Sequence, residues 1–159
     1  MEELSTIPTP CTTKIQALRD SIAQIIVGQT QATDLLLTSV IARGHVLIEG
    51  VPGVAKTLLA RVMAQLIDAR FSRVQFTPDL MPSDVLGTTV YNMKTGDFDF
   101  HPGPVFADVV LADEINRAPA KTQAALFEVM EERQVTVDGT PRAMSDVFTI
   151  IATQNPVEQ

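Results

Sequence analysis

The chain has 159 residues, of which 45% are hydrophobic and 19% are charged, and its net charge is −7. This length suits one domain with a sizeable core, and the composition excludes a disordered chain. The negative charge argues against a non-specific nucleic-acid coat, which needs a positive field. The single cysteine, Cys11, excludes an internal disulfide framework, and residues 1–5 lack a signal-peptide pattern. No apolar run approaches the roughly 20 residues of a membrane span, so we expect a cytoplasmic protein.

The N-terminal region predicts a lead-in followed by helices. Two prolines within residues 5–13 argue against a helix there, and Thr12 or Thr13 is the expected N-cap. Apolar residues then recur at helical spacing up to Gly28, and again from residue 31 to 42. We therefore divide the chain into a lead-in and helix at 1–30 and a core at 31–159.

The rest of the chain alternates strands with helices. Short, nearly continuous apolar runs predict strands, and apolar residues at helical spacing predict helices. The strands are expected at 46–48, 71–76, 109–112 and 147–152, and the helices at 56–67 and 120–132. This alternation is typical of an α/β fold in which helices cover both faces of a parallel sheet.

Two hairpins interrupt this alternation. The segment 87–104 holds two strand-like runs around Lys94-Thr95-Gly96-Asp97, and the segment 135–144 holds two runs around Asp138-Gly139. Asp-Gly is a strong signal for a tight hairpin turn. We expect both segments to be insertions in the parallel fold.

A candidate phosphate loop follows the first expected strand. Its sequence is Gly50-Val51-Pro52-Gly53-Val54-Ala55-Lys56-Thr57, and it opens the next helix. Glycines let backbone N–H groups approach phosphate oxygens, and the helix N-terminus favours negative charge. In this pattern Lys56 reaches the β- and γ-phosphates and Thr57 places its hydroxyl on Mg²⁺. Ala55 stands where glycine is usual, so a glycine-rich turn without a ligand is the alternative interpretation.

Polar residues end two later strands. Asp113 and Glu114 follow an apolar run, at the edge where open α/β sheets bind ligands. Asp113 suits a magnesium ligand acting through water, and Glu114 suits a base that orients and deprotonates a water molecule. Asn155 follows the next run and could hydrogen-bond the γ-phosphate and that water. The alternatives are a solvated acidic strand end and an ordinary Asn-Pro turn.

Several segments together resemble the MoxR branch of the AAA+ ATPases. Besides the phosphate loop, the segments that carry the resemblance are 112–119 (ADEINRAP), 121–126 (KTQAAL), 132–139 (ERQVTVDG) and 152–156 (ATQNP). The similarity runs from about Ile15 to the end of the chain. Ala55 is itself usual in that branch. The resemblance implies a three-layer αβα P-loop NTPase core.

The resemblance implies a role for each matching position. Lys56 and Thr57 fall on the Walker A lysine and threonine, Asp113 and Glu114 on the Walker B pair, and Asn155 on sensor 1. Catalysis then falls to Glu114, Lys56 and Asn155, and Mg²⁺ to Thr57 and Asp113. The residues expected around ATP are Val27, Gly28, Gly50, Val51, Pro52, Gly53, Val54, Ala55, Lys56, Thr57 and Leu58.

The resemblance also implies partners. The hairpins at 87–104 and 135–144 correspond to the helix-2 insert and to the hairpin before sensor 1, which face the ring pore in AAA+ relatives. MoxR-type proteins are regarded as chaperone-like ATPases that form rings, and the family implies that these rings are hexamers. They often act with von Willebrand factor A-domain proteins on client proteins. We expect the same here, with no nucleic-acid partner and no membrane span.

The resemblance implies that these 159 residues stop before the family's last core strand and helical lid, where the arginine finger and second sensor are expected. In the family's strand order the last strand pairs with the strand at 46–48, so we expect that strand to have an unpaired edge here. An arginine on the transferring phosphoryl group raises the rate by about 10³–10⁵. We therefore expect these 159 residues alone to bind nucleotide weakly and to hydrolyse little.

Two other functions stay open. One is a nucleotide-dependent binding switch, in which hydrolysis is incidental to partner docking. The other is a DNA-directed or chelatase-type relative with the same core, which would need basic or special residues at the hairpin tips. The tips instead mix Lys94 with Asp97 and Asp99, and Arg142 with Asp138.

Overall fold

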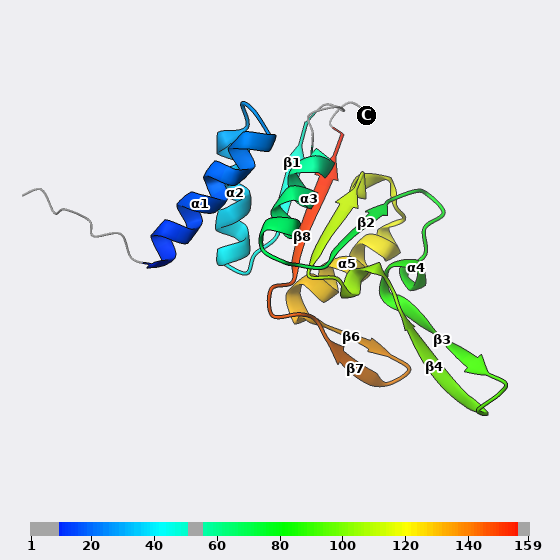
Figure 1. The fold of residues 1–159 in the computed structure, drawn as a ribbon. Coiled ribbons are helices and arrows are strands. Elements are labelled where there is room, and N and C mark those ends of the chain that lie inside the picture. Colours follow the sequence, from blue (N-terminus) through cyan, green and yellow to red (C-terminus); the bar gives the residue numbers. More distant parts are fainter. Residues whose placement is uncertain (1–9, 51–55, 156–159) are drawn as a thin grey trace, which may run out of the picture.

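The computed structural model describes residues 10–50 and 56–155. These residues form a sheet flanked by helices, with two hairpins extending away from it (Figure 1). The helices are α1 (Pro10–Ile25), α2 (Thr30–Ile41), α3 (Lys56–Leu66), α4 (Pro82–Leu86) and α5 (Ala120–Glu132), with short 3-10 turns η1 (Pro104–Phe106) and η2 (Ile115–Arg117). The strands are β1 (Val46–Glu49), β2 (Phe71–Gln75), β3 (Gly87–Asn92), β4 (Asp97–Pro102), β5 (Val109–Asp113), β6 (Gln134–Val137), β7 (Thr140–Ala143) and β8 (Thr149–Gln154).

The central sheet has the strand order β1-β8-β5-β2, and every neighbouring pair is parallel. The parallel sheet expected from the alternating pattern is therefore confirmed. Because the strands are parallel, their carboxyl ends meet at one edge. None of the helices within 10–50 and 56–155 combines the length and the apolar character that crossing a membrane requires.

Helices cover both faces of this sheet, which gives three layers. On one face, Val109 and Leu111 of β5 pack with buried residues of α1, α2 and α3. On the other face, Val110 and Ala112 of the same strand pack with buried residues of α4 and α5. This alternation follows the two-residue period of a strand, and it explains why β5 reads as a continuous apolar run.

Strand β1 lies at the edge of the sheet. Among the described residues its only strand partner is β8, in the register Val46 to Ile151 and Glu49 to Gln154. Leu47 is half exposed. The structure thus confirms that β1, the strand before the predicted phosphate loop, has one unpaired edge.

The hairpins are β3–β4 and β6–β7, as predicted, and both pair antiparallel. Both project from the side of the sheet away from the end of β8 (Figure 1). Two glycines meet at the base of β3–β4. A Cβ added at Gly87 would lie 2.4 Å from the carbonyl oxygen of His101, and one added at Gly103 would lie 2.3 Å from that of Val85. Only glycines allow this backbone contact, which fixes where the hairpin leaves the core.

Two sequence-based boundaries were wrong. Helix α1 already begins at Pro10, within the region expected to be non-helical. Proline is tolerated at the first helical position because its missing N–H has no intrahelical partner there. The last central strand spans Thr149–Gln154, two residues later than expected, because Val147 and Phe148 form a turn whose backbone N–H groups donate to Ser145.

His45, just before β1, ties two elements together. Its Nδ1 accepts a hydrogen bond from the backbone N–H of Ile150 (3.0 Å), and its Nε2 lies 3.3 Å from the carbonyl oxygen of Met130. Accepting at one nitrogen and donating at the other requires the neutral ring. The pKa of His45 lies below its usual 6.5, chiefly because the ring is buried.

Candidate functional site at the carboxyl edge of the sheet

The carboxyl ends of the parallel strands bring most of the predicted polar residues to one edge. Strand β5 ends at Asp113, with Glu114 next, and β8 is followed by Asn155. Strand β1 is followed by Gly50, which donates its backbone N–H to the carbonyl oxygen of Gln154 (3.4 Å). Residues 51–55, which carry most of the predicted phosphate loop, lie outside the described residues.

Lys56 is the first residue of α3, and its side chain turns back toward β1. Its Nζ donates to the carbonyl oxygen of Gly50 at 2.6 Å. The ammonium group therefore lies beside the strand end and the helix N-terminus, where positive charge and helix dipole both favour an anion. Thr57 follows, partly buried, and Leu58 is 45% exposed.

Asp113 is held at both oxygens. Its Oδ1 accepts a hydrogen bond from Thr153 Oγ1 (2.5 Å), and its Oδ2 pairs with Arg73 Nη2 (2.6 Å). Arg73 comes from β2, two residues before Gln75, which is opposite Asp113 in the register. The carboxylate thus ends its strand with a fixed orientation.

Glu114 has a left-handed backbone, with φ 55° and ψ 50°. This conformation costs a residue with a Cβ about 1–2 kcal/mol, and such strain clusters at functional sites. Its N–H donates to Thr153 Oγ1 (3.0 Å), and its Oε2 accepts from Gln75 Nε2 (3.1 Å) and Arg117 Nη1 (3.0 Å). One buried threonine therefore fixes both acidic residues.

Two further predictions concern Asn155 and the segment near Val27. Asn155 is partly buried, and its Oδ1 is buried with no hydrogen-bond partner in the described part of the chain. A buried amide oxygen without a partner is an available acceptor at this edge. Val27 is 89% exposed between α1 and α2, and Gly28 has φ +83°. Their contact with adenine stays a prediction.

The sequence reasoning did not single out four residues of this site: Arg73, Gln75, Arg117 and Thr153. Arg73 and Gln75 are two residues apart in a strand, so their side chains share one face of the sheet. This spacing was the one feature of the sequence that could have indicated a polar site there. Thr153 is 2% exposed and stands between the apolar run of β8 and Asn155, and its residue type alone gives no sign that its hydroxyl reaches the acids of the next strand.

The donor set at this edge fits a hard divalent cation. Mg²⁺ prefers oxygen ligands and keeps several waters, and one carboxylate plus a hydroxyl is a suitable set. Asp113 offers the carboxylate and Thr57, the second residue of α3, the hydroxyl, and their joint role as magnesium ligands stays a prediction. The described residues contain no cluster of three or more His, Cys, Asp or Glu that would suit a fully protein-bound metal.

Comparisons with known proteins identify the family of this chain. Residues 45–159 match the family described as "ATPase family associated with various cellular activities (AAA)". The chain is 52% identical over 137 residues to Chaperone MoxR1 of Mycobacterium tuberculosis, covering 86% of this chain and 36% of that protein. It belongs to the MoxR-type AAA ATPases.

Other relatives support the same family. Protein MoxR of Methylorubrum extorquens is 40% identical over 120 residues, which cover 72% of this chain and 35% of that protein. A crystal structure of a candidate ATPase from Cytophaga hutchinsonii superposes with a TM-score of 0.83 and 48% identity, over 92% of this chain and 44% of that chain. The chain thus spans roughly two fifths of the length of these AAA relatives.

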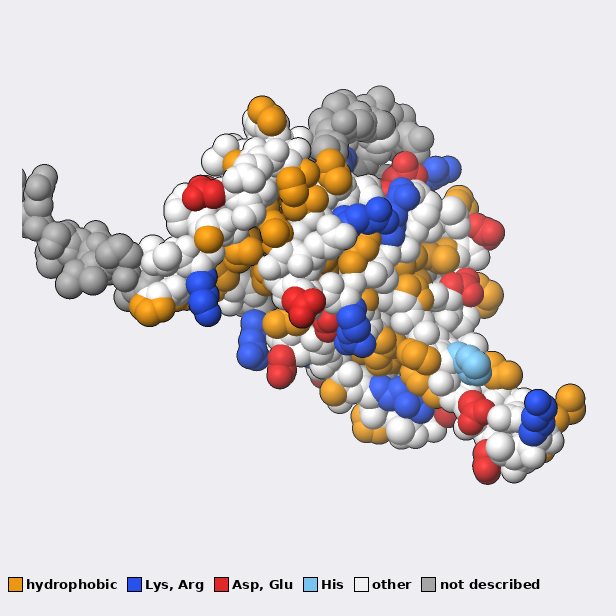
Figure 2. Space-filling model, viewed as in Figure 1, with side chains coloured by type: hydrophobic (Ala, Val, Ile, Leu, Met, Phe, Trp, Pro, Cys, Tyr) orange, Lys and Arg blue, Asp and Glu red, His pale blue; other side chains and the backbone are white. Residues whose placement is uncertain are grey.

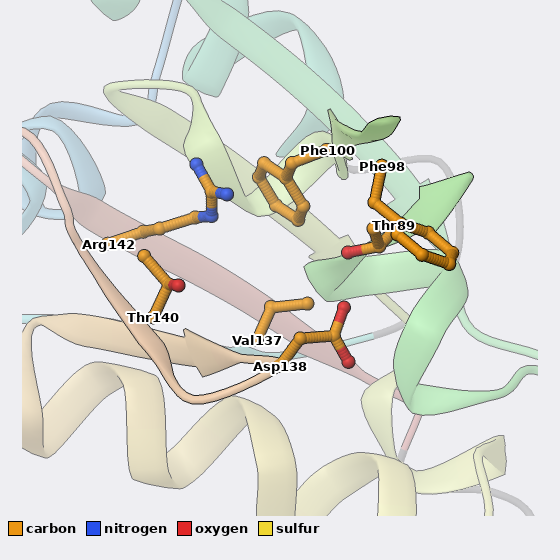
Figure 3. Close-up of a pocket in the computed structure, with 7 residues that line it drawn as sticks. All are labelled: Thr89, Phe98, Phe100, Val137, Asp138, Thr140 and Arg142. Carbon is orange, nitrogen blue, oxygen red and sulfur yellow. The ribbon is translucent and has the colours of Figure 1, made fainter. Parts of the chain in front are cut away.

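The two hairpins line a hollow of about 480 Å³ (Figure 3), and they lie on the side of the sheet away from the carboxyl edge (Figure 1). The β3–β4 hairpin contributes Thr89, Phe98 and Phe100, and the β6–β7 hairpin contributes Val137, Asp138, Thr140 and Arg142. The guanidinium carbon of Arg142 lies 3.8 Å from the centroid of the Phe100 ring. This stacking links hairpins that are about forty residues apart in the chain.

Proposed function

We propose that this chain binds ATP with Mg²⁺ and hydrolyses it as part of a MoxR-type AAA ATPase that remodels partner proteins. One observation carries the proposal. Lys56 begins α3, Asp113 ends β5 with Glu114 next, and Asn155 follows β8, so all four residues lie at the carboxyl edge of one parallel sheet. Open α/β sheets bind their ligands at this edge.

Each side chain has chemistry that suits this reaction. Lys56 would exchange the neutral carbonyl of Gly50 for an anionic phosphate oxygen, which makes a stronger charge-assisted hydrogen bond. Thr57 and Asp113 would hold Mg²⁺, which when bound neutralises charge developing on the phosphoryl oxygens. Glu114 would orient and deprotonate the attacking water, and Asn155 would accept or donate a hydrogen bond beside it.

The hairpins are proposed to contact the partner proteins. The β3–β4 hairpin exposes apolar side chains, including Tyr91 (52%), Met93 (89%) and Phe98 (72%). Exposed apolar groups of this size are suited to protein contacts. The name "Chaperone MoxR1" of one relative supports this assignment. From the family resemblance we extend the proposal to a ring homo-oligomer, a hexamer, with a von Willebrand factor A-domain protein as its partner.

The test of nucleotide binding uses a matched pair of lysines. Lys56→Ala removes the ammonium group at the start of α3, whereas Lys121→Ala removes an exposed one in the first turn of α5. Titration of the full-length protein with a fluorescent ATP analogue, with and without Mg²⁺, should give at least tenfold weaker binding for Lys56→Ala alone. Equal affinities in both variants and the wild type would refute the proposal.

A nucleotide-dependent binding switch is the second candidate function. The observation that favours it is the occupied carboxylate of Glu114, which accepts hydrogen bonds from Gln75 and Arg117. Glu114→Gln separates the two functions, because it preserves shape and removes the base. Loss of phosphate release together with loss of partner release supports the ATPase, whereas unchanged partner release supports the switch.

Charge argues against a DNA-directed function. The end of the β3–β4 hairpin carries acidic as well as basic side chains (Figure 2). The sequence pI is about 4.7. A nucleic-acid surface needs clustered Lys and Arg.

A further inference from the structure

Arg73 lies at the carboxyl edge of the sheet and has no role in the proposed function. Its Nη2 and Nε donate to Asp113 Oδ2 at 2.6 and 3.2 Å, and its Nη2 also donates to Gln75 Oε1 at 3.2 Å. Thr153 occupies the other carboxylate oxygen of Asp113. Every oxygen of the proposed metal-side acid therefore already has a donor, and one of these donors is a cation.

Both acids at this edge are paired with an arginine before any metal binds. Arg73 neutralises Asp113, and Arg117 neutralises Glu114. A divalent cation at Asp113 would stand within a few ångströms of the Arg73 guanidinium, and like charges at this distance repel. The Arg73 side chain is 48% exposed, so on turning into solvent it regains hydration and loses only its contacts to Asp113 and Gln75.

The geometry points to Arg73 as a positioning residue that holds Asp113 in place before nucleotide arrives and competes with the metal for it. This rests on the proposed function, since it takes Asp113 as the acid on the metal side. The metal ion of a metal–nucleotide complex can bind the Asp113 carboxylate only after it displaces the Arg73 guanidinium. Removing Arg73 should tighten metal binding, although it removes an ion pair.

The alternative is that Arg73 only ties β2 to β5. A matched pair at the other end of the same two strands has that role. Arg70 donates through Nε (3.1 Å) and Nη2 (3.0 Å) to Asp108, and its backbone N–H donates to the same carboxylate (2.8 Å). Arg70→Gln therefore removes an interstrand Arg–Asp pair without touching the acidic edge.

The experiment is a Mn²⁺ titration followed by electron paramagnetic resonance, on the full-length protein with a non-hydrolysable ATP analogue. Exposed and half-exposed ion pairs correspond to changes of a few-fold, so Arg73→Gln should bind Mn²⁺ about three- to tenfold more tightly. Arg73→Lys keeps the charge but loses the forked contact, so it should fall between the two. Arg70→Gln should match the wild type.

Unchanged or weaker Mn²⁺ binding in Arg73→Gln overturns the inference. If Arg73→Gln does not fold, as judged by circular dichroism, Arg73→Lys decides: no tightening there overturns the inference as well. Nucleotide binding in chelator distinguishes the two levels of the argument. Lys56-dependent nucleotide binding in chelator, together with unchanged Mn²⁺ affinity in Arg73→Gln, rejects only the inference, whereas no Lys56-dependent nucleotide binding rejects the proposed function too.

Discussion

Replacing Thr153 by valine should destabilise the protein strongly, although valine has the same shape. Thr153 Oγ1 donates to the carboxylate of Asp113 and accepts from the N–H of Glu114. A hydrogen bond to a charged group contributes about 1.5–3 kcal/mol, and a buried N–H left without an acceptor costs about 1–3 kcal/mol. Since the two effects share one hydroxyl and are not additive, we expect a loss of about 2–4 kcal/mol.

The same strand offers the matched control. Thr149 is also fully buried in β8, but its Oγ1 has no hydrogen-bond partner among the described residues. Thr149→Val removes a polar atom that costs free energy to bury, so it should be neutral or stabilising by about 1 kcal/mol.

Urea unfolding of both variants measures the difference. For a protein of this size the urea m-value is about 2 kcal/mol/M, so Thr153→Val should lower the midpoint by about 1–2 M at unchanged m. Thr149→Val should leave the midpoint in place or raise it. A loss below 0.5 kcal/mol for Thr153→Val, or equal losses for both variants, would contradict the role assigned to Thr153 (differences of about 0.5 kcal/mol are typical of neutral sites).

Two further predictions concern a hairpin and a histidine. Gly103→Ala should lower the free energy of unfolding, measured with denaturant, by about 2–4 kcal/mol, because the added Cβ would collide with backbone although φ is ordinary. Gly96→Ala should lower it by only about 1–2 kcal/mol, because φ is +78° but the space around the residue is open. Equal losses in the two variants would refute the close backbone contact at Gly103. Burial lowers the pKa of His45, so the unfolded chain takes up its proton first, and the stability that His45 contributes above pH 6.5 is lost as pH falls below that value. The thermal midpoint should therefore fall less between pH 7.5 and 5.5 in His45→Gln than in the wild type, and identical pH slopes would contradict this.

The sequence predicted the parts of the fold that repeat along the chain. Continuous apolar runs such as that of β5 indicated a doubly covered parallel sheet, and the parallel arrangement placed Asp113 and Asn155 at the same edge. The edge position of β1 followed from the family's strand order. These features depend on patterns within one segment or on a known order of segments, so they can be inferred without coordinates.

Contacts between segments were not predictable in the same way. The pairing of Arg73 with Asp113 depends on the register between β2 and β5, and a shift of one residue would turn Arg73 to the other face. The role of Thr153 required its hydroxyl to reach an acid on a neighbouring strand. The left-handed backbone of Glu114 has no signal in the residue type, because glutamate rarely adopts it.

Strand β8 touches both halves of the proposed site, with Gln154 bonded to Gly50 on one side and Thr153 bonded to Asp113 on the other. A substitution in β8 should therefore impair the proposed nucleotide binding and the proposed phosphate-bond hydrolysis together. Genetic separation of these two activities should come from alleles in β1 or in β5 and its following turn. Substitutions in β8 should impair both together. A probe placed in this strand should therefore respond to both steps.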